Sequence, residues 1–159
     1  MADGDTGAQD QAPPAPNPAL RRLDVLVGTW DMKGRESGPE GEIHGRLVFE
    51  WLEGGYFLVQ HFDIDHLGRR AKGIEIIGYG RDWGGQASED CTSQMFDNTG
   101  NAFSYTWDVE EETITIWGGQ RGSSAAFKGR FSDDRNTVTG AWEWPGGGYQ
   151  ATMTRVRNG

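Results

Sequence analysis

Residues 23–30 read Leu23-Asp24-Val25-Leu26-Val27-Gly28-Thr29-Trp30, an apolar segment that passes through a glycine into a tryptophan. The glycine lets the backbone turn tightly, and an indole is large enough to plug the closed end of a barrel. The stretch resembles the start of a β-barrel, with the first strand beginning at this corner. Small antiparallel barrels either fill their interior with side chains or hold one small ligand there, so we expect any function to lie inside.

The segment before the corner has helical signals. Asn17 is a good N-cap residue, and Pro18 fits the first turn of a helix. Leu20, Leu23 and Val27 then recur at helical spacing. We expect one or two helical turns that close one end of the barrel.

From Thr29 onward, apolar residues alternate with polar ones, and Gly, Asn and Asp mark the turns. No connection has room for a crossover helix, so the sheet is expected to be antiparallel. The pattern predicts an all-β fold, a single antiparallel up-and-down β-barrel of about ten strands with a short N-terminal helix. The expected strands are Trp30–Arg35, Ile43–Leu52, Tyr56–Ile64, Lys72–Tyr79, Ala87–Asp97, Ala102–Glu110, Thr113–Trp117, Ser124–Phe131, Thr137–Trp144 and Tyr149–Val156.

Alternation also assigns the inner face of each strand. In the third strand both faces are half apolar, and we favour the one that puts Gln60 inside and His61 toward solvent. Glycines expected on the inner face leave space that neighbouring indoles only partly fill; they are Gly45, Gly129 and Gly140. Aromatic and apolar side chains of this face are the candidate ligand-binding residues, with Gln60 among them. The set is Leu47, Phe49, Trp51, Gln60, Phe62, Tyr105, Trp107, Phe127 and Trp142.

Composition limits the partners and the compartment. A net charge of -9 argues against nucleic acid and anionic membrane surfaces, which are bound by clustered Lys and Arg. The single cysteine, Cys91, fits a reducing compartment, and we expect a cytoplasmic protein. No apolar run approaches the ~20 residues of a membrane helix. Residues 1–16 have the composition of a disordered tail, and residues 17–159 are expected to form one β-barrel domain.

Several blocks of the chain together resemble a known family. They are residues 51–61, 73–79, 96–101, 127–134 and 139–143, in that order. They are similar to an uncharacterised bacterial family of lipocalin-like, or calycin, barrels, and the similarity extends from Leu20 to Val156. The resemblance implies the barrel fold, but that family has no established substrate to carry over.

A more distant resemblance is to the nitrobindin group, haem-binding barrels that also begin with a Gly-x-Trp strand. In that group a histidine near the C-terminal end of the barrel holds the haem iron. The last expected strand here has no histidine, which leaves His44, His61 and His66 as the only substitutes. We therefore expect no cofactor and keep haem binding as a second alternative.

Catalytic motifs are sparse. The chain has no zinc-ligand spacing, no phosphate-binding loop and no Gly-x-Ser-x-Gly elbow. Glu75 with Asp97, or His61 with Glu50, could act as an acid–base pair if they faced a closed cavity, where burial raises a carboxyl pKa. The competing interpretation places these groups in ion pairs on the outer face.

Three functions follow from these observations. The first is a carrier or sensor that binds a small hydrophobic molecule in the barrel. The alternative is a cofactor-free cyclase or isomerase that holds a lipophilic substrate in a reactive shape. The third is an interaction module or homodimer that pairs through outer apolar residues, either Ile74 and Ile76 or Ile114 and Ile116.

Overall fold

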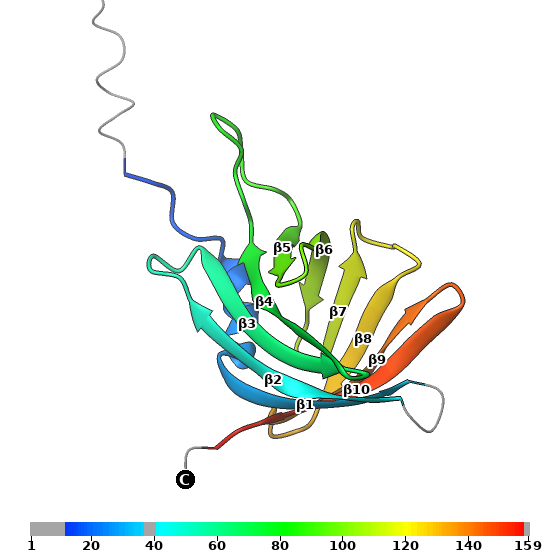
Figure 1. Ribbon diagram of the computed structural model, residues 1–159. Coiled ribbons are helices and arrows are strands. Elements are labelled where there is room, and N and C mark those ends of the chain that lie inside the picture. Colours follow the sequence, from blue (N-terminus) through cyan, green and yellow to red (C-terminus); the bar gives the residue numbers. More distant parts are fainter. Residues whose placement is uncertain (1–11, 37–40, 158–159) are drawn as a thin grey trace, which may run out of the picture.

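The computed structural model describes residues 12–36 and 41–157, which form a closed antiparallel β-barrel preceded by one helix (Figure 1). Each strand pairs with the next along the chain, and β1 pairs with β10 to close the barrel. The predicted fold class is confirmed. The strands are β1 Gly28–Glu36, β2 Glu42–Trp51, β3 Phe57–His66, β4 Arg69–Gly78, β5 Cys91–Asp97, β6 Ala102–Val109, β7 Thr113–Gly118, β8 Ala126–Phe131, β9 Thr137–Trp144 and β10 Gly147–Arg155.

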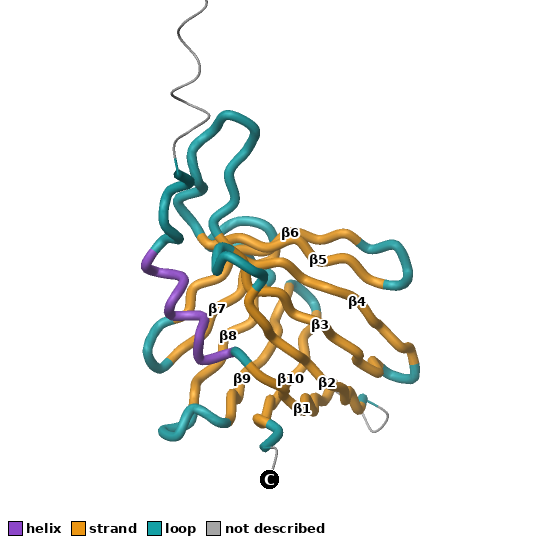
Figure 2. Tube along the Cα trace, turned by 90° about the vertical axis from the view of Figure 1, so that its left-hand side faces the viewer, coloured by secondary structure: helices purple, strands orange, loops and turns teal. Residues whose placement is uncertain are grey.

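The helix, η1, spans Pro18–Leu26 and is a 3₁₀ helix. Its N-cap is Asn17, whose side chain accepts a hydrogen bond from the backbone of Ala19 at 3.0 Å, as the sequence predicts. The buried face repeats every third residue, at Leu20, Leu23 and Leu26, which suits three residues per turn. Figure 2 shows the helix across one end of the strands.

The corner after η1 has the predicted geometry. Gly28 has a φ of 124°, a left-handed conformation that favours glycine. Trp30 is 1% exposed, and its indole N–H donates to the carbonyl of Leu26 at 2.8 Å. Arg155 at the end of β10 lies over the same ring, 4.3 Å from its centroid, and donates to the carbonyls of Val25 and Val27. The first and last strands are thus fastened to the helix at one point.

The inner face follows the predicted alternation. Gln60 lies on the inner face of β3 and is buried, whereas His61 is exposed and contacts Glu50 at 3.1 Å on the outside. Other outer-face positions carry ion pairs, such as Arg70 with Asp63 at 2.6 Å. Charged side chains therefore lie outside on most strands, as expected.

Two connections differ from the sequence prediction. The third and fourth strands extend to a two-residue turn at Leu67 and Gly68, where both residues have positive φ. A leucine in that conformation is uncommon, so the sequence did not indicate a tight turn there. The fifth strand begins only at Cys91, because residues 79–90 form a projecting loop (Figure 1) that holds one isolated bridge, Arg81 to Ala87.

The expectation that inner-face glycines leave open space is wrong. A Cβ at Gly140 would lie 2.4 Å from the carbonyl oxygen of Lys128 and 2.8 Å from the ring of Phe127. Gly129 meets the same ring at 2.8 Å, and Gly45 is crowded by the backbone of β3. At these glycines the missing side chain leaves room for the close approach of the Phe127 ring or of a neighbouring strand.

Most of the predicted tail, residues 1–11, lies outside the described residues. Of the remainder, Pro14 accepts a hydrogen bond from the hydroxyl of Tyr56 at 2.5 Å. The division at residue 17 stays a prediction. Among the described residues, no helix has the length and apolar character that crossing a membrane requires.

Candidate functional site

The interior of the barrel contains a cavity of about 130 Å³, and Leu26 of η1 is among the residues that line it. Its walls are mostly apolar and aromatic. Seven of the nine predicted ligand-binding residues line it: Leu47, Phe49, Gln60, Tyr105, Trp107, Phe127 and Trp142. Tyr105 and Phe127 both pack against Trp142 with ring centroids 5.8 Å apart, which builds a continuous aromatic wall.

The other two predicted residues lie elsewhere. Trp51, at the end of β2, donates its indole N–H to the carboxylate of Asp24 at 2.8 Å and so helps to attach η1. Phe62 is buried over Gly73, where an added Cβ would come within 2.7 Å of its ring. Both side chains serve the packing of the barrel rather than the cavity.

Several lining residues were missed by sequence reasoning. They come mainly from β1, β7 and β10, and include Met32, Ile114, Ile116, Tyr149, Ala151 and Met153. The alternative that placed Ile114 and Ile116 on the outer face is therefore wrong. The alternation within β10 was a usable signal, because Tyr149, Ala151 and Met153 stand two residues apart.

Glu75 is the one carboxyl group that lines the cavity in the described part of the chain. It lies on β4 directly opposite Gln60 on β3, so both side chains share the inner face. The hydroxyl of Ser93 donates to Oε2 of Glu75 at 2.6 Å, and the indole N–H of Trp107 donates to the same oxygen at 3.1 Å. The indole also contacts Ser93 at 2.9 Å, so the three side chains form one network.

Two polar groups beside this network have unused hydrogen-bonding capacity. Oε1 of Glu75 and the carboxamide of Gln60 have no side-chain partner among the described residues. Both groups are therefore at least slightly accessible, because every fully buried polar side-chain atom among the described residues has a hydrogen-bond partner. Both residues line the cavity, which makes these atoms candidates for contact with a ligand.

Burial raises the pKa of Glu75 from its ordinary value of 4.5 to about 7, although the hydrogen bonds from Ser93 and Trp107 favour the charged form. Burial also raises the pKa of Tyr105 to about 12 and that of the Cys91 thiol to about 12. The pKa of Tyr149 is raised for the same reason. Glu75 is thus the cavity group that changes charge near neutral pH.

The structure brings neither predicted acid–base pair together in the cavity: Asp97 is not hydrogen bonded to Glu75, and His61 contacts Glu50 outside the barrel. Asp97 lies at the β5–β6 turn, where hydrogen bonds from Asn101 and Thr99 lower its pKa to about 2. His61 and Glu50 pair on the outer surface. The outer-face interpretation holds for His61 and Glu50, whereas Asp97 is hydrogen bonded within its turn and forms no ion pair among the described residues. Glu75 points inward because it faces Gln60 across the β3–β4 pair.

The cavity residues do not fit a haem. No histidine lines it: His44 and His61 lie on the outer face, and His66 packs edge-on against Tyr149 with centroids 5.5 Å apart. A cavity of about 130 Å³ is also smaller than the ~300 Å³ at which ordinary cofactor sites begin. Among the described residues, no group of three or more His, Cys, Asp and Glu could hold a metal ion.

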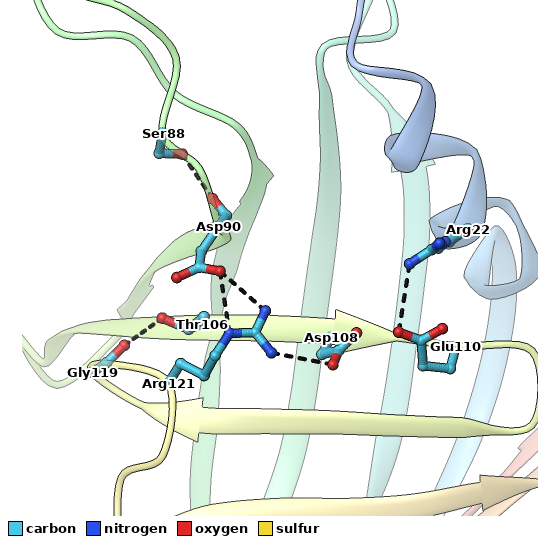
Figure 3. Close-up of polar contacts among 8 residues, drawn as sticks. All are labelled: Arg22, Ser88, Asp90, Thr106, Asp108, Glu110, Gly119 and Arg121. Carbon is cyan, nitrogen blue, oxygen red and sulfur yellow. Dashed lines mark hydrogen bonds and ion pairs between the residues drawn. The ribbon is translucent and has the colours of Figure 1, made fainter.

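A polar cluster on the outside of β6 is separate from the cavity (Figure 3). Arg121 from the β7–β8 loop donates to Asp90 and Asp108, and Arg22 of η1 contacts Glu110 at 3.5 Å. These side chains are about half exposed, so each pair stabilises the fold only weakly. The cluster holds the loops and the helix against the barrel wall.

No family model matches the chain, and no curated protein matches it. A solved structure to which the chain is similar is a de novo designed fluorescence-activating β-barrel. The two share 17% sequence identity, the match covers 84% of this chain and 96% of that chain, and the TM-score is 0.45. The resemblance to lipocalin-like and nitrobindin-like barrels stays a prediction.

Proposed function

We propose that this protein binds a small, mainly apolar molecule inside the barrel. The observation that supports this most directly is the cavity itself, whose apolar and aromatic walls surround a few converging polar groups. An apolar cavity of about 150 Å³ in another protein takes up benzene, so a volume of about 130 Å³ suits a ligand of one ring or a short chain. Such a site fits the role of a carrier or of a sensor.

Fluorobenzene is a suitable probe, with binding followed by fluorine NMR. Ala151 lines the cavity, so an Ala151→Leu variant fills part of it and should weaken binding by about tenfold or more. Ala141 is the matched control, because it lies on the outer face of β9 and the same change leaves the cavity intact. Near-ultraviolet circular dichroism verifies that both variants fold. Unsaturable binding by the wild type, or equal binding by both variants, contradicts the proposal.

A second candidate is an isomerase or cyclase that works by acid–base catalysis without a cofactor. Glu75 favours it, since a carboxyl with a pKa of about 7 beside an apolar cavity is suited to proton transfer near neutral pH. The network with Ser93 and Trp107 would hold one oxygen in place and leave the other for the substrate.

Ring opening of benzisoxazole tests this chemistry. A base removes the ring C–H proton, the released electron pair forms a nitrile, and the N–O bond breaks to give a phenolate. If Glu75 is that base, the rate of ring opening rises with pH through about 7. The Glu75→Gln variant should lose this catalysed reaction. An unchanged rate in Glu75→Gln rules out Glu75 as the base.

A further inference from the structure

We infer that the ligand is a small organic amine, an apolar body of about one ring that carries a protonated nitrogen, and that Glu75 is its counter-ion. This inference rests on the proposed binding function and deepens it by naming the chemical class. It stands on four observations: an unpaired carboxylate oxygen, an unpaired carboxamide, an aromatic wall, and the absence of any cationic side chain in the lining of the described cavity.

The charge of the site selects against anions. Glu75 lines the cavity, and none of the described residues that line it is Lys, Arg or His. A carboxylate ligand would meet a like charge without a basic partner, at a site where burial makes uncompensated charge costly. A protonated amine instead gives the ionised Glu75 a counter-charge, and the net charge of -9 favours its approach.

The geometry matches the needs of an ammonium group. Oε2 of Glu75 is held by Ser93 and Trp107, which leaves Oε1 free to accept an N–H bond. Gln60 is only 8% exposed and directly opposite Glu75, so its carboxamide oxygen can accept a second bond. The rings of Tyr105, Phe127 and Trp142 line the same cavity and would pack against the apolar body.

The test compares three probes that share one ring and differ in the head group: para-fluorobenzylamine, para-fluorobenzyl alcohol and para-fluorobenzoate. At pH 8 the wild type should bind the amine at least about tenfold more tightly than the alcohol, and the benzoate least of all. The Glu75→Gln variant keeps the size of the side chain and removes its charge. It should lose about tenfold in amine affinity and change little toward the alcohol.

The pH dependence provides a second measurement that needs no variant. The amine stays protonated from pH 5 to 8, while Glu75 gains a proton toward pH 5, so amine binding should weaken by about tenfold and alcohol binding should stay constant. Of the titratable groups on the elements around Glu75, Cys91 of β5 and Tyr105 of β6 both have a pKa raised to about 12 and stay protonated. Tyr149 of β10, also in the cavity, has a raised pKa, and on β3 Glu75 faces the uncharged Gln60.

A Ser93→Ala variant sharpens the assignment. The Ser93 hydroxyl lowers the pKa of Glu75, so its removal should move the pH midpoint of amine binding upward. The same midpoint in wild type and variant would show that another group controls binding.

The outcomes distinguish a failure of the proposed binding function from a failure of the amine inference. If none of the three probes binds the folded wild type, the proposed binding function fails. If the alcohol binds and the amine binds no better, or if Glu75→Gln weakens both equally, the amine inference alone is overturned. Preferred binding of the benzoate overturns it as well.

Discussion

Glu75 makes the stability of the protein depend on pH in an unusual direction. Its pKa is about 7 in the folded protein and 4.5 without the fold, so the folded state holds the proton more tightly. This contribution is fully present below pH 4.5 and is lost as the pH rises through about 7. The free energy of unfolding should fall by about 3 kcal/mol across that interval because of this group.

Urea unfolding of wild type and Glu75→Gln at pH 4.5, 6 and 8 measures the effect as a difference, which cancels the other carboxyl groups. The variant should match the wild type at the lowest pH and exceed it by about 3 kcal/mol at the highest. Glu143, exposed on the outer face of β9, supplies the control, and Glu143→Gln should show no such divergence. Parallel curves for wild type and Glu75→Gln would refute the assignment.

Among the tryptophans of the described residues, Trp30 is the most buried and Trp83 the most exposed. Trp30 is 1% exposed and hydrogen bonded to Leu26, whereas Trp83 projects fully from the β4–β5 loop. Trp30→Ala should therefore destabilise the fold by about 3 to 5 kcal/mol through the cavity it leaves. Trp83→Ala should alter stability by less than about 0.5 kcal/mol. Thermal unfolding followed by circular dichroism compares the two, and similar losses would contradict the burial pattern.

At the level of elements, the β3–β4 hairpin contains a correctable strain. Leu67 has a φ of 56° and is 42% exposed, so its side chain gains little from burial to offset the left-handed backbone. Leu67→Asn should stabilise the protein by about 1 kcal/mol, because asparagine tolerates this conformation. Gly68→Ala should destabilise it by a similar amount, about 1 kcal/mol, since Gly68 also has positive φ. Chemical unfolding measures both, and a destabilised Leu67→Asn variant would contradict this account.

The same hairpin explains how far the sequence could predict the fold. Strand positions followed from alternation, which is strong wherever one face of a strand is buried and the other wet. The turn at Leu67 did not follow, because leucine carries no turn signal. The residues 65–71 were therefore expected to be a connection, although the strands continue through His66 and from Arg69.

The candidate site could be predicted to a similar degree. The part of that prediction that failed did so for a related reason. Aromatic residues such as Tyr105, Trp107 and Trp142 were found because alternation assigns them to the inner face. The inward position of Glu75 depends on the register of the β3–β4 pair, which the turn at Leu67 and Gly68 sets. With that turn known, Gln60 on the inner face would have placed Glu75 opposite it.

Considered as a whole molecule, the barrel is mostly filled. Phe62, Phe127 and the bulky aliphatic residues of the core occupy much of the interior, and the crowded glycines contribute no space. The remaining cavity of about 130 Å³ sets the size of any ligand held inside. The specificity of the protein would then depend on the few polar atoms that face this small volume.

The closure of the barrel has a consequence for biosynthesis. Of the ten strand pairs in the described part of the chain, nine join neighbours in sequence, and the tenth joins β1 to β10, where Trp30 lies opposite Arg155. A ribosome synthesises about 5 to 20 residues each second, so one edge of β1 stays unpaired for several seconds before β10 emerges. Such an edge recruits other strands. The nascent chain is therefore most vulnerable to aggregation just before synthesis of β10, and a chaperone that shields β1 would act in that interval.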